Sequence, residues 1–547
     1  MATLADTTAG TPPAYLMGLL PWHDPLDTVV GFSIRQGYYK PYALWREGVF
    51  LYEKEAPPAL PQNQDVYLLH TVPLLWSRVP YTRVRFDQSS RRTQLLAIQH
   101  GQTFRRGTGL SFIYQRRTRT GEYLGQTTDH YGTGVAFYSC GRGVWFLLKG
   151  GWNQLQDGIN GGVVYEASPM DGFRKERQVV RTNGARLRRW YRFAEGEVGL
   201  RMGAQYAIAF FTRLSEDRIE REGPAALRRE SPLFNDSAGF ALGVRQIRRL
   251  GGIRLYWGSF QGEARLTQHE GRADTFFRQS WNLSAVELQA QVSREKIFSC
   301  LSYRRWLGPR RLPPAFRVEA EWRPSWYQVG FSHEQRNLPW LAYLQATEGL
   351  TKGWVGVSLS SGDTTLPPLS GRIWLAQWRQ PWLAETTYYQ GRSILSAGWT
   401  VQGGWRKGVL GFLCGATVQR VLQAPSTWHL TIPALTGWVQ PFLRWQLRKT
   451  PPVYQLGVRL WGFTAFRPLS YDLALGTFYL NPTYADYGLK PYLWADPYLV
   501  ILVKRVMVYL RVEHVTEGWI APGYYLSAWY PMPGRAFSFG VQWDIYN

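Results

Sequence analysis

The chain has 547 residues and a formal net charge of +24, and it contains 26 Trp, 32 Tyr, 26 Phe and 55 Gly. No apolar run approaches the roughly 18 residues that a membrane-spanning helix needs, so that class is excluded. The three cysteines lie far apart, which excludes a disulfide framework and a CxxC zinc site. Aromatic residues favour both half-buried sheets and membrane interfaces, so a β-rich membrane protein remains open.

Residues 1–75 differ from the rest of the chain because they are rich in proline, for example at Pro12-Pro13 and Pro57-Pro58. We expect this segment to be a periplasmic strap or a hatch within a lumen. A disordered leader followed by one edge strand fits the pattern equally well. The first residues lack the basic and long apolar regions of a secretory signal, so we expect the signal to have been removed or to precede Met1.

From Tyr81 onward, apolar and polar residues alternate with period two, which predicts half-buried strands. A hairpin is predicted around Pro324-Ser325, where residues 316–323 and 327–334 each have one apolar and one polar face. Similar runs cover residues 395–402, 410–418, 439–448 and 506–513. No amphipathic helical pattern of useful length occurs, which argues against an α/β enzyme.

Short and long connections are predicted to alternate between these strands, as in bacterial barrels with short periplasmic turns and long extracellular loops. The short ones are predicted at Gly141-Arg142, Gly251-Gly252, Pro324-Ser325 and Lys504-Arg505, and the long ones at 153–184, 213–240, 261–276, 419–436 and 463–496. The last residues form an amphipathic strand that could close a barrel, with Phe537, Phe539, Val541, Trp543 and Ile545 on one face. The predicted fold is all-β, a large antiparallel transmembrane β-barrel of roughly 20–24 strands over residues 76–547.

The alternation assigns side chains to the two faces of the barrel wall. An arginine facing lipid would cost roughly 2–4 kcal/mol at the bilayer midplane, so charged strand residues are expected to face the lumen. The predicted lumen residues are Arg83, Arg85, Arg317, Glu319, Glu321, Arg444, Arg459, Arg511 and Glu513. The aromatic residues predicted at the membrane interface are Trp322, Trp326, Tyr327, Trp399 and Trp445.

Several segments resemble the putative porin family of Bacteroidota-type outer membranes. The matching pieces are Trp22–Asp27, Pro80–Phe86, His100–Gln102, Gly121–Tyr123, Gln126–His130, Asn160–Val163, Arg511–Val515 and Tyr530–Arg535. The middle of the chain matches in style rather than by motif. The resemblance implies an outer-membrane barrel that passes small solutes and carries no catalytic residues.

The expected function is therefore a porin-like channel for passive diffusion of small solutes, biased toward anions by lumen arginines. The alternative is a plugged structural or secretion-linked barrel without channel activity. Outer-membrane lipid, lipopolysaccharide, the barrel-assembly machinery and small solutes are the expected partners. No enzyme activity, cofactor or metal site is predicted, because the eight histidines form no ligand pair. Nucleic-acid binding is not expected, since the arginines are spread along the chain without a basic helix.

Overall fold

The computed structural model describes Leu69, Thr71, Val72, Leu74 and residues 80–546, apart from internal gaps. The gaps are 91, 106, 122–124, 126, 142, 159–183, 204, 225–239, 275–278, 295–296, 308–314, 323–326, 338–346, 360–368, 380–381, 385–386, 390–393, 424–432, 447–451, 467–469, 473–476, 480–490, 518, 520–524, 528–529 and 532–533. The described residues include no helix that is long and apolar enough to cross a bilayer.

The described residues form 22 long strands of one sheet. They are β1 (Tyr81–Ser89), β2 (Thr93–Arg105), β3 (Thr108–Arg119), β4 (Thr128–Cys140), β5 (Val144–Gly158), β6 (Arg186–Arg201), β7 (Tyr206–Gly223), β8 (Phe240–Trp257), β9 (Phe260–Asp274), β10 (Gln279–Arg294), β11 (Ile297–Leu307), β12 (Ala315–Trp322), β13 (Tyr327–Asn337), β14 (Thr347–Leu359), β15 (Leu369–Arg379), β18 (Ile394–Lys407), β19 (Leu410–Gln423), β20 (Leu435–Gln446), β21 (Val453–Phe463), β24 (Tyr492–Val503), β25 (Val506–Glu513) and β28 (Ala536–Tyr546). Three small hairpins lie in the connections, namely β16 (Trp382–Ala384) with β17 (Thr387–Tyr389), β22 (Ser470–Asp472) with β23 (Thr477–Tyr479), and β26 (Tyr525–Ser527) with β27 (Tyr530–Pro531).

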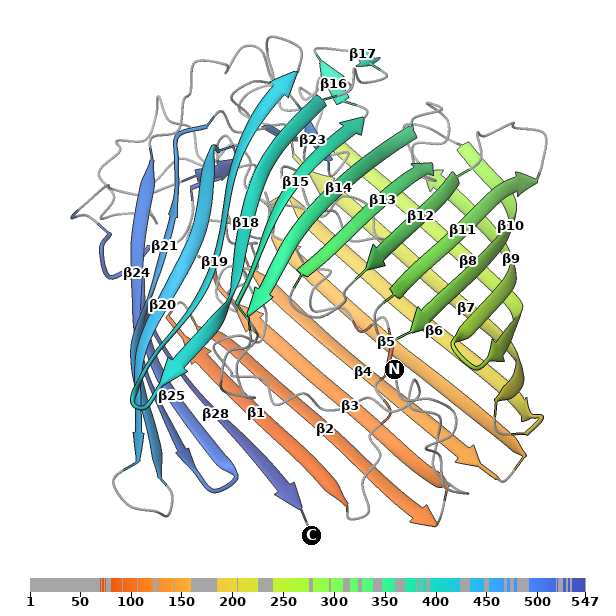
Figure 1. The fold of residues 1–547 in the computed structure, drawn as a ribbon, viewed down its shortest axis with the longest axis horizontal. Helices are drawn as coiled ribbons and strands as arrows, with labels where there is room; N and C mark the ends of the chain where they lie inside the picture. Colours follow the sequence, from red (N-terminus) through yellow and green to blue (C-terminus); the bar gives the residue numbers. More distant parts are fainter. Residues whose placement is uncertain are drawn as a thin grey trace.

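Each long strand pairs antiparallel with the next one along the chain, and β28 pairs with β1 to close the sheet (Figure 1). At the closure, Tyr81 lies opposite Tyr546 and Ser89 opposite Ser538. A closed barrel leaves no unpaired strand edge, which is what a membrane-spanning sheet requires. The predicted all-β barrel of roughly 20–24 strands is therefore confirmed, with 22 strands.

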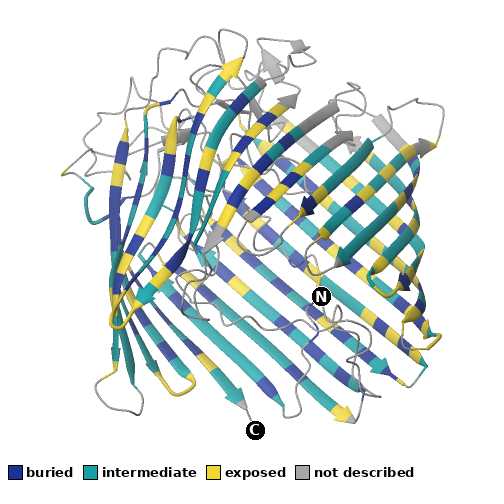
Figure 2. Ribbon diagram, viewed as in Figure 1, coloured by how far each residue is buried: buried dark blue, intermediate teal, exposed yellow. Residues whose placement is uncertain are grey.

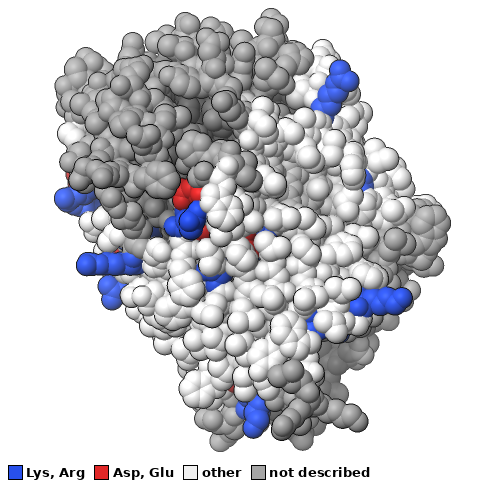
Figure 3. Space-filling model, turned by 90° about the vertical axis from the view of Figure 1, so that its left-hand side faces the viewer, with Lys and Arg blue, Asp and Glu red and all other residues white. Residues whose placement is uncertain are grey.

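Burial alternates residue by residue along the strands, as Figure 2 shows. The outward positions carry exposed apolar side chains on every side of the barrel, among them Val198, Phe210, Ile253, Leu288, Leu301, Ile373, Leu375 and Leu456. Figure 3 shows one side of this outer surface as a broad expanse of uncharged residues with charged side chains scattered around it. Because such a surface would be unfavourable in water, it matches the hydrocarbon layer of a bilayer.

The two ends of the barrel differ in the length of their connections. Connections of a few residues join β2 to β3, β4 to β5, β6 to β7 and β24 to β25, at the end where β28 finishes. The opposite end carries the long connections 159–185, 224–239, 380–393, 464–491 and 514–535. By the general rule for bacterial barrels, the first end is periplasmic and the second extracellular.

Two predicted connections are wrong, and the one predicted at 213–240 is shorter than expected, at 224–239. Gly251-Gly252 lies inside β8, whose turn to β9 is at Gly258-Ser259, and residues 261–274 belong to β9. Residues 213–223 likewise belong to β7. These segments looked like loops because both of their faces are polar over many residues. Strand pairing with their neighbours on both sides, which no single-strand pattern reveals, stabilises them.

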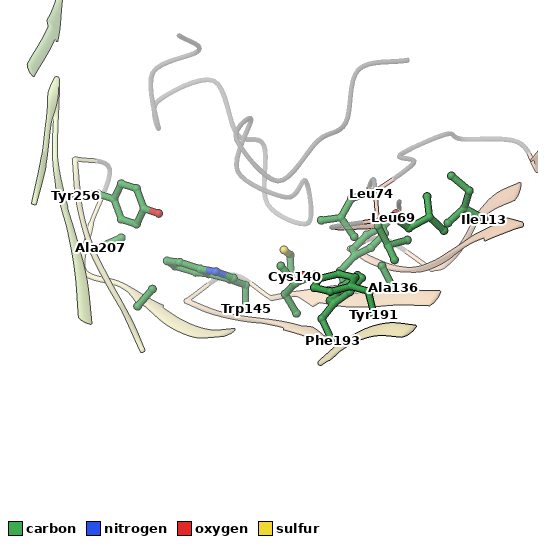
Figure 4. Packing of buried hydrophobic residues seen from close by; sticks show 14 residues of the cluster. Leu69, Leu74, Ile113, Ala136, Cys140, Trp145, Tyr191, Phe193, Ala207 and Tyr256 are labelled. Atoms are coloured by element: carbon green, nitrogen blue, oxygen red, sulfur yellow. The ribbon is translucent and has the colours of Figure 1, made fainter. Parts of the chain in front are cut away.

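A cluster of buried side chains lies on the inner face of β3 to β8, and it includes three residues from before the first strand. Leu69, Val72 and Leu74 are almost fully buried there, close to Ile113 and Ala136 (Figure 4). The remainder of the predicted N-terminal strap or hatch lies outside the described residues, apart from Thr71.

Candidate functional site: the inner wall of the barrel

The predicted lumen residues lie on the inward face of the described strands. Each alternates with an outward apolar neighbour, as Arg459 does with exposed Leu456 and partly exposed Leu460. The strand register brings the residues into three groups. One lies on β12, one at the closure of β1 and β28, and one on β20 to β25.

The largest set of inward ion pairs runs across β6 to β11. Arg254 donates to Glu197 at 2.8 Å and to Glu263 at 2.9 Å. Arg265 binds both Glu263 and Glu287, and Arg304 donates to Glu287 at 2.9 Å. We call these six residues the lumen ladder. On β12, Arg317 pairs with Glu319 at 2.5 Å, and Glu321 is buried nearby on the same face.

In the lumen ladder the carboxylates are buried, and the arginine side chains are more exposed than the carboxylates they bind. The side chains of Glu197, Glu263 and Glu287 are 4–8% exposed, whereas those of Arg254, Arg265 and Arg304 are 19–25% exposed. Trp145 on β5 donates its indole N–H to Glu197 at 2.9 Å. A buried carboxylate is stable only when it is paired and hydrogen-bonded, and each of the three meets that condition.

A second group joins the two ends of the sheet. Arg83 pairs with Asp544 at 2.6 Å, and the hydroxyl of Tyr81 donates to the same carboxylate at 2.8 Å. Arg85 pairs with Asp87 at 2.6 Å, and the hydroxyl of Tyr509 also donates to Asp87. The contacts of Asp544 with Tyr81 and Arg83, and of Tyr509 with Asp87, link residues more than four hundred positions apart, so they stabilise the closed form of the barrel.

The third group lies on β20 to β25. Arg511 pairs with Glu513 at 2.7 Å and approaches Asp496 at 3.9 Å, while Asp496 accepts the backbone amide of His514. Arg459 donates to Gln440, and its guanidinium lies 5.0 Å from the ring centre of Trp438. Arg444, on β20, shares the inward face of this sheet region.

The arrangement changes what the lumen arginines can do. Most of the predicted ones have a carboxylate partner, and the lumen ladder contains as many glutamates as arginines. Charge compensation at this distance removes most of the positive potential that an anion would meet. Six inward carboxylates were not among the predicted lumen residues, namely Asp87, Glu197, Glu263, Glu287, Asp496 and Asp544. The alternation along each strand places them on the inward face, but their partners depend on the register between strands.

The outward aromatic residues occupy two kinds of position. Trp322 and Trp399 are about half exposed on the outer face, and Trp445 stacks on Tyr454 with ring centres 5.7 Å apart. Trp326 lies outside the described residues, and only the backbone of Tyr327 is described. On the closing strand, Phe537 and Trp543 are exposed, and Phe539, Val541 and Ile545 share their outward face.

No group of three or more His, Cys, Asp or Glu side chains among the described residues is arranged to hold a metal ion. The three cysteines are free thiols on the strands β4, β11 and β19.

Comparison with known proteins gives two kinds of match. The model of a family described as "Putative porin" matches residues 427–547, which cover the barrel from β20 to β28. No curated protein matches the chain.

Among solved structures, the chain is similar to the siderophore receptor PiuA from Acinetobacter baumannii, with 8% identity, a TM-score of 0.59, and coverage of 86% of this chain and 82% of that one. It is similar to the ferric yersiniabactin uptake receptor FyuA from Yersinia pestis, with 11% identity, a TM-score of 0.59, and coverage of 85% and 80%. The copper transporter OprC matches with 10% identity, a TM-score of 0.60, and coverage of 86% and 82%.

These matches correct the expected function. The three similar barrels named above are a siderophore receptor, a ferric yersiniabactin uptake receptor and a copper transporter, and they do not support passive diffusion through an open, anion-biased pore. The outer-membrane location agrees with the prediction, and so does the resemblance to the family. The chain is thus a large outer-membrane β-barrel whose C-terminal region matches the putative porin family.

Proposed function

We propose that this protein takes up a specific solute across the outer membrane through a barrel that its own N-terminal segment obstructs. In this proposal residues 1–75 act as a lumen hatch and residues 76–547 form the transmembrane barrel. The observation that carries it is the burial of Leu69, Val72 and Leu74 against the inner wall. It is also supported by strand number, since 22-stranded outer-membrane transporters as a class have a plugged lumen.

The contact between this segment and the wall is shaped by specific residues. Asn153 on β5 accepts the backbone amide of Leu69 at 2.7 Å and donates to the Leu69 carbonyl at 3.0 Å. Two inward glycines of β4 make room for the segment. A Cβ at Gly134 would lie 2.5 Å from Val72, and one at Gly132 would lie 3.2 Å from Leu69. A wall that is hydrogen-bonded and contoured to a segment favours one seated position for it.

The proposed cargo is a metal ion carried as a chelate. This class is named for the similar barrels, which are receptors for siderophores and transporters of iron and copper. The proposal contains no catalytic step and no resident cofactor. Lipopolysaccharide and the barrel-assembly machinery are proposed partners. The source is proposed to be a Gram-negative bacterium of the Bacteroidota type, because residues Tyr530–Arg535 resemble the corresponding segment of that family.

The obstruction is tested by recording currents from the purified full-length barrel in planar bilayers. We expect no steady conductance from the wild-type protein and frequent current steps from Asn153→Leu, which loses both hydrogen bonds to Leu69. Gln154→Leu, one residue along the same strand, is the matched control and should stay silent. Steady conductance from the wild-type barrel would contradict the proposal.

The cargo class is tested by quenching of tryptophan fluorescence on titration with a ferric catecholate, a ferric hydroxamate and a copper chelate. At least one should bind saturably to the wild-type barrel, and the metal-free chelators should bind more weakly. If none of the three chelates binds saturably, the cargo class is wrong even when the obstruction is real.

A further inference from the structure

Several strands on one side of the barrel are much longer than a bilayer requires. β7 and β8 have 18 residues each, and β6 and β10 have 16, whereas a transmembrane strand needs about 9–11. Their periplasmic halves carry outward apolar residues such as Phe210, Ile253 and Leu288. Their extracellular halves must therefore extend beyond the hydrocarbon layer.

On these extracellular halves the outward residues change from apolar to charged. The described outward arginines there are Arg186, Arg188, Arg192, Arg218, Arg245, Arg249 and Arg272, and the outward glutamates are Glu216, Glu220, Glu222 and Glu270. The change is abrupt along a single strand. On the outer face of β8, exposed Ile253 is followed toward the extracellular end by Gly251 and then by Arg249. The charged surface thus begins where the apolar belt ends, at the level of the lipid headgroups.

The register aligns three of these arginines in one row. Arg218 on β7 lies opposite Arg245 on β8, and Arg245 lies opposite Arg272 on β9. Like charges directly opposite each other on antiparallel strands are destabilising. Trp190 on β6 lies opposite Arg218, and its ring centre is 5.3 Å from the guanidinium. Two adjacent like-charge pairs concentrate positive charge along this row.

The carboxylates on this surface compensate only part of the charge. Glu216 is shared by two guanidinium groups, those of Arg192 and of Arg245, the latter at 2.7 Å. Arg218 pairs with Glu220 at 2.5 Å, and Arg249 pairs with Glu270. The side chains of Arg192, Arg218 and Arg245 are still 55–67% exposed. More than half of each of these side chains therefore remains accessible to a ligand.

We propose that this row and its neighbours, Arg192, Arg218, Arg245, Arg249 and Arg272, bind the phosphate groups of lipopolysaccharide in the outer leaflet. A guanidinium group matches phosphate oxygens in a two-point geometry. Anionic lipid headgroups attract basic residues just outside the hydrocarbon layer. The surface faces away from the lumen, so it meets lipid rather than cargo. The inference rests on the lipopolysaccharide contact proposed above and is independent of what the barrel transports.

The test measures binding of lipopolysaccharide to the purified full-length barrel in detergent. The variant replaces Arg218, Arg245 and Arg272 together by Gln. The control replaces Lys407 and Arg505 by Gln, since both are exposed at the periplasmic turns. We expect the triple variant to bind lipopolysaccharide more weakly by on the order of a hundredfold, and the control to bind like the wild type. Enzymatically dephosphorylated lipopolysaccharide should bind the wild type as weakly as the intact lipid binds the triple variant.

Competitors separate the possible sources of the phosphate. Phosphatidylglycerol and inorganic phosphate should each displace lipopolysaccharide poorly. Equal displacement by either one would overturn the assignment to lipopolysaccharide, and unchanged binding by the triple variant would overturn the site. Heat-modifiable gel migration of each variant verifies that its barrel is folded. The metal-chelate titration separates the lipid site from transport. The triple variant should bind the chelate as the wild type does, even though its lipopolysaccharide site is removed.

Discussion

The hydroxyl of Tyr509 on β25 donates to the carboxylate of Asp87 on β1 at 2.6 Å, reaching across the closing strand β28 that lies between them. The register places Gly540 opposite both residues. A side chain at Gly540 would overlap the Tyr509 ring and the Asp87 carboxylate. A glycine in the closing strand therefore allows the first and penultimate long strands to be joined directly.

Replacing Gly540 with alanine should weaken the closure of the barrel. The added methyl group must displace Tyr509 or Asp87, which leaves a buried carboxylate short of one donor and costs roughly 1–3 kcal/mol. Urea unfolding in detergent, followed by tryptophan fluorescence, measures the loss. Gly371→Ala is the control, because a Cβ there meets open space. Equal unfolding midpoints for the two variants would show that the Tyr509–Asp87 contact adds nothing to closure.

The lumen ladder should depend most on its shared carboxylate, Glu287. The variant Glu287→Gln removes the charge that two arginines, Arg265 and Arg304, share. Because these guanidinium groups are partly solvated, we expect a loss of roughly 1–3 kcal/mol in the free energy of unfolding. The control is Glu222→Gln, whose pairing with Arg188 at 3.5 Å is exposed, and its effect should stay within about 0.5 kcal/mol. A loss for Glu287→Gln no larger than the control's would mean that the ladder is not a stabilising element.

The general fold was predictable because the barrel wall imposes a period of two on every strand. At the closing strand, Phe537 and Trp543 are exposed and Ser538 and Gln542 are buried, as the alternation alone indicates. The same rule placed Arg83 and Arg511 on the inward side. It applies to each strand by itself and needs no knowledge of the neighbours.

The partners of the inward charges could not be predicted in this way. Arg83 and Asp544 are separated by 461 residues, and their contact depends on how β1 and β28 are aligned. Glu197 and Arg254 meet across an intervening strand, which requires two registers at once. The error at Gly251-Gly252 has a related cause, since the outward face of β8 is charged beyond the apolar belt and no longer alternates in hydrophobicity.

The seat of the N-terminal segment should be sensitive to added volume on β4. Gly134→Ala places a methyl group 2.5 Å from Val72 and should displace that residue from the wall. We expect limited proteolysis of the variant in detergent to cut before residue 80 at least about tenfold faster than in the wild type, because cleavage follows the population of the open form. Gly353→Ala on β14 is the control, because a Cβ there meets no atom within 4 Å, and this variant should be cut at the wild-type rate. Identical cleavage rates for the two variants would show that the contact of Val72 with Gly134 does not hold the N-terminal segment against the wall.

The outward apolar belt gives the most direct test of which face meets lipid. Leu288 on β10 is 52% exposed, and its diagonal neighbours Leu266 on β9 and Leu301 on β11 are exposed on the same side. Leu288→Arg should lose roughly 2–4 kcal/mol of folding free energy in phospholipid vesicles if the position lies near the midplane, because a guanidinium group is poorly solvated by hydrocarbon. Leu288→Phe keeps the position apolar and should change stability by less than about 1.5 kcal/mol. In water-filled surroundings the arginine would instead be harmless, so equal folding yields of the two variants in vesicles would mean that this face does not contact lipid.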